Sequence, residues 1–510
     1  MMGIKEERPS LFSYHVNLEK RIPENHPLRK VKELIDFGFI RSEVEHFYGN
    51  NGNVSVDPSV ILKLMFLLFF DDISSERELM RTIPYRMDYL WFLDYGLDDE
   101  VPDHSVLSKA RRRFRPAIFE SFFVRVLLQC VDAGLVDGSK LHFDGSLVDA
   151  DASKGSVKKG PPELISALKE AYRSQERKLD DTDDEGTVSC PSGDASRPSD
   201  YKPVNDNLMS KTDPDSAIVS KRGIPPRPRY KNHRAVDDAH GVITAVETTA
   251  GDVEENALLI DLVEQSELNT GVKVSVAIAD SQYGTVDNFR KCARLGIKSH
   301  MSDLGGSSKS RVQKSGIFTE SDFCYDPETD TYRCPAGRIL KRRRHKKQLK
   351  AYEYAISPKV CKACELKSKC TRSKTGRSVK RHYDHDLIEA ARAESRSAAA
   401  KRDRRRRKRL MEGSFADATN NHGFKRARWR RLWRQKIQDL IIAICQNIRI
   451  LIKNQQTDLA VSARKVQEIA SNDLSSAVIR PVLALYGRIR RSLLHNKEII
   501  EKLIFQPCEG

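Results

Sequence analysis

The chain lacks any apolar segment long enough to cross a membrane. In its 510 residues the longest apolar run is Val60–Phe70, which Lys63 interrupts, whereas a membrane-spanning helix needs roughly 20 apolar residues. The first residues, MMGIKEERPSLFSYH, also lack the apolar core of a signal peptide. We therefore expect a cytoplasmic protein with no membrane partner.

The chain also lacks the composition of a disordered protein. Hydrophobic residues make up 39% of it, which is slightly low for a globular protein but enough to form real cores. Its length allows about three domains at roughly 150 residues each. Wholesale disorder is therefore excluded.

Acidic residues are too few to balance the basic ones. The chain has 88 Lys and Arg against 71 Asp and Glu, a formal net charge of +17. A basic protein of this size suggests a polyanionic partner. Ten Cys without a signal peptide suggest a reducing compartment, in which clustered Cys more often bind metal than form disulfides.

Residues 1–125 are expected to form a helical domain. Asp57 followed by Pro58 is a typical helix start, and another helix is predicted to run from about Ser105 to Phe114 with several basic residues. Such short helices are typical of a helix-turn-helix or another small DNA-binding unit. A helical bundle with a solvated basic face explains the pattern equally well.

A mixed α/β region is predicted next. Its expected strands and helices, in chain order, are strands Lys140–Asp144, His233–Val236 and Val242–Thr248, helix Asp261–Leu268, strand Val272–Asp280 and helix Val286–Leu295. This order is typical of a mixed sheet covered by helices. Residues 179–216 are poor in apolar residues and rich in Asp, Ser and Pro, so we expect a disordered acidic insertion there.

Two carboxylates stand at expected strand ends, Asp144 in LHFDGS and Asp280 in VAIADSQYG. Acids on neighbouring strands, with a third from a helix, would offer the oxygen ligands that Mg²⁺ or Mn²⁺ prefers. Two such ions can assist the displacement at a phosphodiester. An isolated Asp after a strand is, however, usually a turn or cap residue.

Six segments in order resemble the DDE-type transposases of bacterial insertion sequences. They are FDGSLVDADAS around Asp144, TDPDS at Thr212–Ser216, YKNHRAVDDAHGVITAVETT at 230–249, ADSQYG around Asp280, CPAG at 334–337 and MEGSFADATNNHGFKRAR around Glu412. In addition, PDHSVLSKARRRF at 102–114 resembles the end of the family's N-terminal domain. The resemblance is to the branch with a ribonuclease-H-like catalytic domain and an N-terminal helical domain. It covers about residues 15–455.

The resemblance implies a catalytic triad that holds two Mg²⁺ or Mn²⁺ ions. Asp144 and Asp280 match its first two members and Glu412 its third. Relatives often have Arg four residues before the Glu and Lys seven residues after it, and here these positions are Lys408 and Thr419. DNA contacts at the second position are therefore in question, whereas the metal triad is intact.

Basic residues in two places are predicted to contact DNA. Residues 401–434 hold 14 Lys or Arg against three acids, a balance that attracts phosphates, although such runs are often only solvated helix faces. The candidates are Ser105, Ser108, Lys109, Arg111, Arg112, Arg113, Lys408, Arg409, Lys425 and Arg426.

A cluster of Cys between 320 and 376 is a second candidate metal site. Cys361 and Cys364 form a CxxC pair, with Cys370 downstream and Cys334 upstream. Four thiolates can bind one structural Zn²⁺, and a segment with little apolar content needs some stabilising link. The alternative is a set of reduced thiols in a basic loop.

The predicted fold is α/β, a ribonuclease-H-like mixed sheet with an N-terminal all-α domain and an inserted Cys-rich basic subdomain. The expected parts are a helical DNA-binding domain at 1–125, the first part of the catalytic domain at 138–318, the Cys-rich insertion at 319–378, the Glu-bearing helices at 379–455 and a helical tail at 456–510.

The function that the resemblance implies is transposition by a metal-dependent endonuclease and strand transferase. The enzyme would bind the terminal inverted repeats of its own mobile element as a homodimer on double-stranded DNA, in the nucleoid of a bacterial cell. The alternatives are a non-catalytic DNA-binding regulator derived from a transposase and a nuclease without strand transfer.

Overall fold

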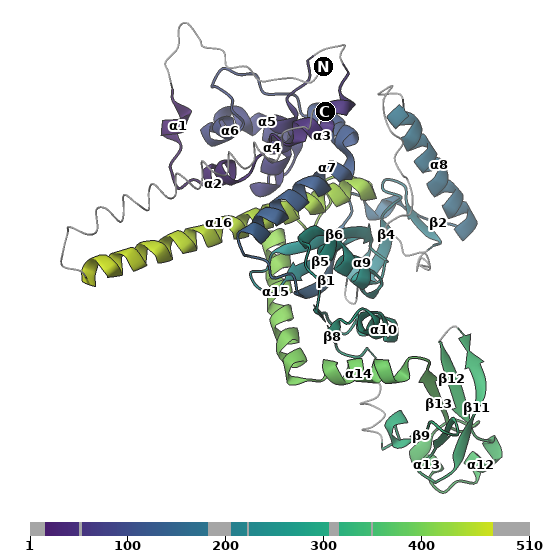
Figure 1. Ribbon diagram of the computed structural model, residues 1–510. Helices are drawn as coiled ribbons and strands as arrows, with labels where there is room; N and C mark the ends of the chain where they lie inside the picture. Colours follow the sequence, from purple (N-terminus) through teal and green to yellow (C-terminus); the bar gives the residue numbers. More distant parts are fainter. Residues whose placement is uncertain are drawn as a thin grey trace, which may run out of the picture. The chain divides into compact units, whose positions relative to one another are not determined.

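The computed structural model describes residues 16–49, 54–181, 206–221, 224–304, 316–347 and 350–472. The chain divides into two compact units, 1–450 and 451–510. In the second unit the described residues, 451–472, are the last part of a helix, and the other described elements belong to the first unit (Figure 1). Among the described helices, none is long and apolar enough to span a bilayer.

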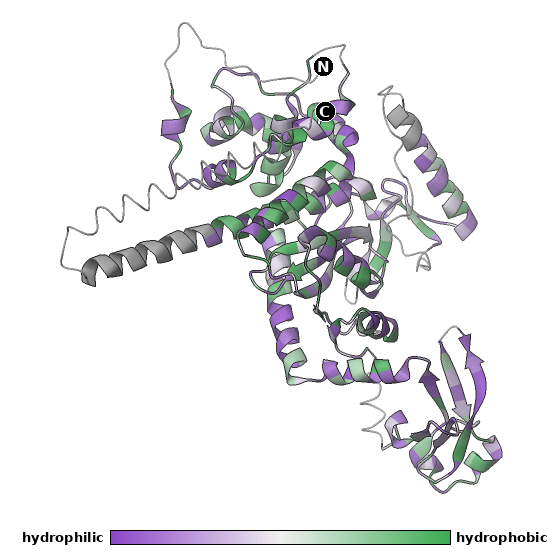
Figure 2. Cartoon of the chain, viewed as in Figure 1, coloured by the Kyte–Doolittle hydropathy of each residue, from purple (hydrophilic) through white to green (hydrophobic). Residues whose placement is uncertain are grey.

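The N-terminal region is helical, as predicted. Its elements are α1 (Leu18–Arg21), α2 (Pro27–Leu34), α3 (Ile40–Val44), the 3₁₀ helix η1 (Glu45–Phe47), α4 (Pro58–Phe70), α5 (Glu76–Thr82), the 3₁₀ helix η2 (Ile83–Tyr85), α6 (Met87–Phe92) and α7 (Ser105–Asp132). The side chain of Asp57 caps α4 by accepting a hydrogen bond from the Ser59 N–H at 2.9 Å. Nearly every residue of α4 is buried, which explains the apolar run in the sequence (Figure 2).

Helix α7 extends well beyond its expected end at Phe114. Arg115 has a φ of 57° and a non-helical ψ of 175°, and Pro116 follows it. Because Pro has no N–H to donate, the helix kinks here and then continues. The kink is where the sequence pattern predicts a helix end.

A six-stranded mixed sheet follows. Its strands are β1 (Lys140–Asp149), β4 (Ala217–Lys221), β5 (Ile224–Asp237), β6 (Ile243–Ala250), β7 (Val276–Ile278) and β8 (Lys298–His300). The order is β4-β5-β1-β7-β8, with β6 paired to β5. Strand β5 is antiparallel to β1 and β6, whereas β7 is parallel to β1 and β8. The mixed α/β prediction is therefore confirmed, although β7 is shorter than the predicted strand 272–280.

Helices α9 (Leu259–Thr270) and α10 (Val286–Arg294) pack against this sheet. Phe143 of β1, Leu259 of α9 and Phe289 of α10 belong to one fully buried cluster. The 3₁₀ helix η4 (Glu255–Leu258) leads directly from the end of β6 into α9. The cluster therefore holds β1 and the turn before α9 in place relative to each other.

The prediction of a disordered insertion at 179–216 is wrong at both ends of the segment. Helix α8 (Pro162–Asp181) extends to its start, and β3 (Leu208–Ser210) pairs with β2 (Val157–Lys159) near its end, just after the 3₁₀ helix η3 (Lys154–Ser156). Asp213 is completely buried. Composition misled near its end because Ser210, Asp213 and Ser216 are buried although they are polar. Residues 182–205 lie outside the described ranges.

A second, antiparallel sheet is formed by residues 324–382. Its strands are β9 (Cys324–Asp326), β10 (Thr331–Arg333), β11 (Ile339–Lys346), β12 (Ala351–Ala355) and β13 (Ser378–His382), in the order β13-β12-β11-β10-β9. The 3₁₀ helix η5 (Glu320–Asp322) precedes it, and α12 (Pro358–Lys362) and α13 (Lys367–Cys370) lie between β12 and β13. Its small core consists of Phe323, Tyr332, Leu340, Tyr354 and Val379.

Three helices complete the described chain: α14 (His385–Ser395), α15 (Ala398–His422) and α16 (Leu432–Asn472). The apolar stripe of α16 is buried, and Asn447 on this helix exchanges two hydrogen bonds with the backbone of Ile243, at 2.8 and 2.9 Å. Helix α16 is thereby held against β6. This part of α16 is therefore a packing element.

Candidate functional site

Asp144 and Asp280 lie side by side on two neighbouring strands of the central sheet, but Asp144 is inside β1, not at its end as predicted, whereas Asp280 follows the end of β7. The parallel register pairs His142 of β1 with Ile278 of β7, so each Asp lies two residues beyond the last paired position of its strand. Two residues along a strand return the side chain to the same face. The register therefore brings both predicted carboxylates together.

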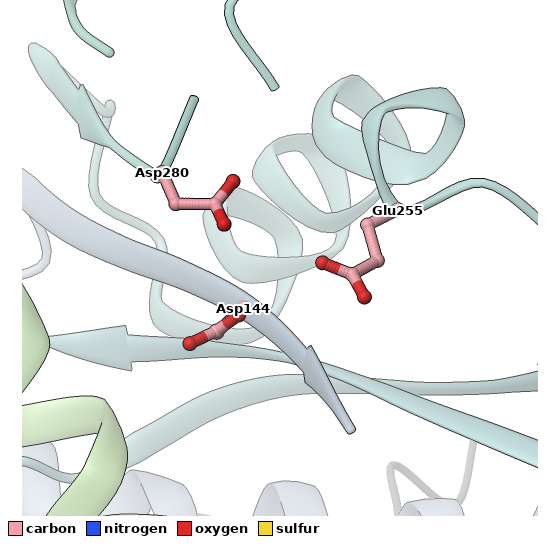
Figure 3. A group of neighbouring side chains, drawn as sticks. All are labelled: Asp144, Glu255 and Asp280. Atoms are coloured by element: carbon pink, nitrogen blue, oxygen red, sulfur yellow. The ribbon is translucent and has the colours of Figure 1, made fainter. Parts of the chain in front are cut away.

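A third carboxylate, Glu255, joins them from η4. One oxygen of each of Asp144, Glu255 and Asp280 lies within 4.8 Å of the others, and this is the one such group of His, Cys, Asp or Glu among the described residues. Asp280 and Glu255 point toward one another and Asp144 lies beside them on its strand (Figure 3). Carboxylate oxygens at this spacing suit a hard divalent cation.

The acids are only partly exposed to water. The side chain of Asp144 is 23% exposed and that of Glu255 is 22% exposed. Burial raises the pKa of Asp144, and the charge of Asp280 adds to this effect, whereas Arg407 opposes it. The Arg407 guanidinium donates a hydrogen bond to Asp144 Oδ2 at 2.8 Å, so a cation already lies against this carboxylate.

Tyr283 interacts electrostatically with the same group. It is fully buried, and no atom of the described residues forms a hydrogen bond with its hydroxyl. Burial, together with the charges of Glu255, Asp144 and Asp280, raises its pKa well above the ordinary value. Three hard oxygen ligands and a buried hydroxyl without a partner fit a site that receives an ion and its attached oxygen ligands.

Glu412, the predicted third acid, is not part of this group. The face of α15 that meets the sheet carries Asp403, which pairs with Lys140 at 2.6 Å, and Arg407, followed by the buried Met411. Glu412 is the next residue, so it is rotated about 100° away from Met411 and is exposed. The assignment of Glu412 stays a prediction from the resemblance.

The N-terminal candidates for DNA contact occupy the first turns of α7, at Ser105, Ser108, Lys109, Arg111, Arg112 and Arg113. Lys109 is exposed. Arg111 is only 4% exposed, pairs with Glu76, and stacks over the Trp429 ring at 4.0 Å. The prediction that Arg111 contacts DNA is therefore corrected, since its guanidinium supports packing inside the protein.

The C-terminal candidates lie nearer the acids. Lys408 and Arg409 are exposed on α15, and Lys425 and Arg426 are exposed after it. Lys425 donates a hydrogen bond to Ser146 Oγ at 2.7 Å, two residues from Asp144. Cationic side chains are thus present close to the acidic group.

The four predicted zinc ligands line one cavity of about 40 Å³ within the second sheet region. They are Cys334, Cys361, Cys364 and Cys370, and all are free thiols. Burial raises the pKa of Cys370, and the three neighbouring thiols add to the effect. No three of these sulfurs, all within the described ranges, lie within 4.8 Å of one another, so a shared ion would require the thiols to turn inward.

The sequence interpretation did not find Glu255. In the segment GDVEENALL it looks like an ordinary acid in the first turn of a helix, where the helix dipole favours negative charge. Its position in the turn between a core strand, β6, and the buried helix α9 is the signal that could have identified it. The contact of Arg407 with Asp144 was likewise not predicted, because Arg407 lies within a run of basic residues.

Two family models match parts of the chain. Residues 16–113 match a family described as "Transposase domain (DUF772)" and residues 333–452 match one described as "Transposase DDE domain". No curated protein matches the chain. The second range includes Glu412, whereas Asp144, Glu255 and Asp280 lie between the two ranges.

A DDE domain implies a ribonuclease-H-like fold and a metal-dependent nuclease or transposase. The mixed central sheet and the acidic group are both compatible with this. The N-terminal match is independent of the C-terminal one and names the same kind of protein. Both matches support the interpretation of the chain as a DDE-type transposase of an insertion sequence.

Proposed function

We propose that the chain cuts DNA at the terminal inverted repeats of its own element and joins the released ends to target DNA. The observation that carries this proposal is the placement of Asp144 and Asp280 in equivalent positions of two parallel strands, with their oxygens within 4.8 Å. Residues from distant parts of the sequence meet there, as a catalytic site requires.

Asp144 and Asp280 would hold Mg²⁺ or Mn²⁺, and two ions is the number expected for this chemistry. Bound divalent cations supply positive charge that stabilises the attacking and leaving oxygens of a phosphodiester. The resemblance adds Glu412 as a third ligand, although this residue lies outside the acidic group.

The proposed reaction has two displacements at phosphorus. In the first, a water oxygen bonds to the phosphorus at the element end and loses a proton to solvent, while the bond to the 3′ oxygen breaks and that oxygen takes up a proton. A 3′-hydroxyl and a 5′-phosphate result. In the second, the oxygen of that 3′-hydroxyl loses its proton and bonds to the phosphorus of a target phosphodiester, while the target bond to its 3′ oxygen breaks and that oxygen takes up a proton.

Basic side chains would hold the DNA along this site. Lys408, Arg409, Lys425 and Arg426 are exposed, and each could neutralise a phosphate without reading sequence. On α7, Lys109 is exposed and Ser105 and Ser108 are partly exposed, so they are candidates for recognition of the element end. Two copies of the chain, acting in the bacterial nucleoid, would pair the two ends.

The Cys cavity is proposed to hold one structural Zn²⁺. Four thiols from α12, α13 and the turn after β10 line it, which is the ligand number that structural zinc uses. The core of this sheet contains few buried residues, so bound metal would contribute to its folding.

The test is cleavage of a duplex that carries the element end, with Mg²⁺, followed by detection of joined products. We expect the wild type to nick and join DNA and Asp280→Ala to bind the duplex without cutting it. Full activity of Asp280→Ala would contradict the proposed site.

Binding without cleavage by both the wild type and a triple variant, Asp144→Ala with Asp280→Ala and Glu412→Ala, would favour a non-catalytic regulator. Cleavage without joining would identify a nuclease.

A further inference from the structure

Glu255 is held in place by the core beneath it. It is the first residue of η4, and Leu258 and Leu259, which follow within one turn, are buried in the central cluster. Val253, two residues before it, is also fully buried. The backbone on both sides is therefore anchored, so the carboxylate is presented at a defined position.

The Glu255 side chain lies directly over the backbone of β1. A Cβ added at Gly145 would stand 2.8 Å from Glu255 Cγ, which is closer than two carbons can approach. Gly145 follows Asp144, so the absence of a side chain there lets Glu255 reach the position beside Asp144. The Lys231 ammonium lies 3.9 Å from Glu255 Oε1.

Tyr283 provides an observation independent of the acids. Its hydroxyl is fully buried and without a hydrogen-bond partner among the described residues, a state that destabilises the fold unless a partner is supplied. Asn288 fixes the Tyr283 backbone by donating to its carbonyl at 3.0 Å. An oxygen bound among the three carboxylates would give this hydroxyl the partner that it lacks.

We propose that Glu255 is a third carboxylate ligand of the divalent-ion site, delivered by the turn before α9, and that the Tyr283 hydroxyl donates to an oxygen bound there. This inference rests on the proposed ion site at Asp144 and Asp280. With Glu255, the ion site has three carboxylate ligands that all precede the Cys-rich insertion, and it does not depend on Glu412 of α15.

The test is Mn²⁺ binding by the full-length protein without DNA, measured as loss of the free-Mn²⁺ electron paramagnetic resonance signal. We expect Glu255→Gln to weaken binding about tenfold or more, because ion affinity depends on the number of charged ligands. Glu254→Gln is the matched control, since Glu254 is the preceding residue and is exposed. It should bind Mn²⁺ as the wild type does.

Two further variants separate this inference from the proposed function. Asp144→Asn should lose binding, and its retention of wild-type affinity would reject the ion site itself. Glu412→Gln should bind normally without DNA. Wild-type affinity of Glu255→Gln together with loss in Asp144→Asn would overturn the role of Glu255 and leave the ion site standing.

Two variants that keep every acid provide a control against effects of misfolding. Gly145→Ala keeps every acid but displaces Glu255 from β1, so it should also weaken Mn²⁺ binding. Tyr283→Phe should bind Mn²⁺ more weakly while its ring still fills the core. Melting curves without metal identify any variant that is unfolded, and a folded Gly145→Ala protein with unchanged affinity would contradict the proposal.

Discussion

At the scale of single residues, burial rather than residue type decides which charged groups are available for DNA. Arg111 and Arg407 both belong to basic runs in the sequence, yet the first pairs with Glu76 and the second with Asp144. Lys408 and Arg409, one and two residues after Arg407, are exposed. Adjacent cations on one helix therefore serve different purposes.

Asp213 is a buried acid away from the proposed ion site. The Tyr230 hydroxyl donates to Asp213 Oδ1 at 2.6 Å, and the Arg431 N–H donates to the same oxygen at 3.2 Å. Burial, the largest effect, raises the pKa of Asp213 from 3.8 to about 7. The folded protein therefore keeps a proton on Asp213 at pH values where the unfolded chain has lost it.

This pKa predicts how stability depends on pH. The contribution of Asp213 is fully present below pH 3.8 and is lost as the pH rises toward about 7, a change on the order of 2–4 kcal/mol. Asp213→Asn should remove that loss, because an amide does not ionise and can still accept through its oxygen. Denaturant unfolding at pH 5 and pH 8 measures it, and equal pH dependence in both proteins would contradict the account.

At the scale of elements, α15 is oriented by buried polar contacts. Arg234 of β5 is fully buried, and its guanidinium donates to Ser414 Oγ on α15 and to Gln446 Oε1 on α16, each at 3.0 Å. Its guanidinium also stacks on the Phe415 ring at 4.2 Å. The same strand position pairs with Asp144 across the sheet, so these contacts link the acid-bearing strand to the two helices.

The zinc proposal belongs to the second sheet. Metal analysis of the full chain should find one Zn²⁺ per protein, and Cys361→Ser should lose it because Cys361 lines the shared cavity. Cys324→Ser is the matched control, since Cys324 is exposed and does not line the cavity. A folded wild-type protein free of zinc, or zinc retained by Cys361→Ser, would refute the site.

Sequence patterns predicted the elements better than the contacts between them. The strands predicted at 140–144, 233–236 and 242–248 overlap β1, β5 and β6. The parallel register of β1 and β7 brings Asp144, inside β1, close to Asp280, two residues after β7. Glu255 could not be selected in this way, since only tertiary packing over Gly145 distinguishes it from neighbouring acids. The burial of Arg111 was hidden for the same reason, because Glu76 and Trp429 are distant in sequence.

At the scale of the whole molecule, the count of 88 Lys and Arg overstates the number of cations that are available to DNA. Arg111, Arg234 and Arg407 hold the protein together through contacts with its own groups. The exposed cations that remain include Lys425, which lies next to the acid-bearing strand. Charge would bring the phosphates to the protein, and the carboxylates would determine where a phosphodiester is cut.

The central claim is that the end of the central sheet is the catalytic ion site of this transposase. The most direct measurement is an anomalous difference map from crystals of the full chain grown with Mn²⁺ and an element-end duplex. We expect Mn²⁺ density in contact with Asp144, Glu255 and Asp280. Density held by Glu412 without Glu255 would contradict the assigned third ligand, and Mn²⁺ bound only away from Asp144 and Asp280 would contradict the claim itself.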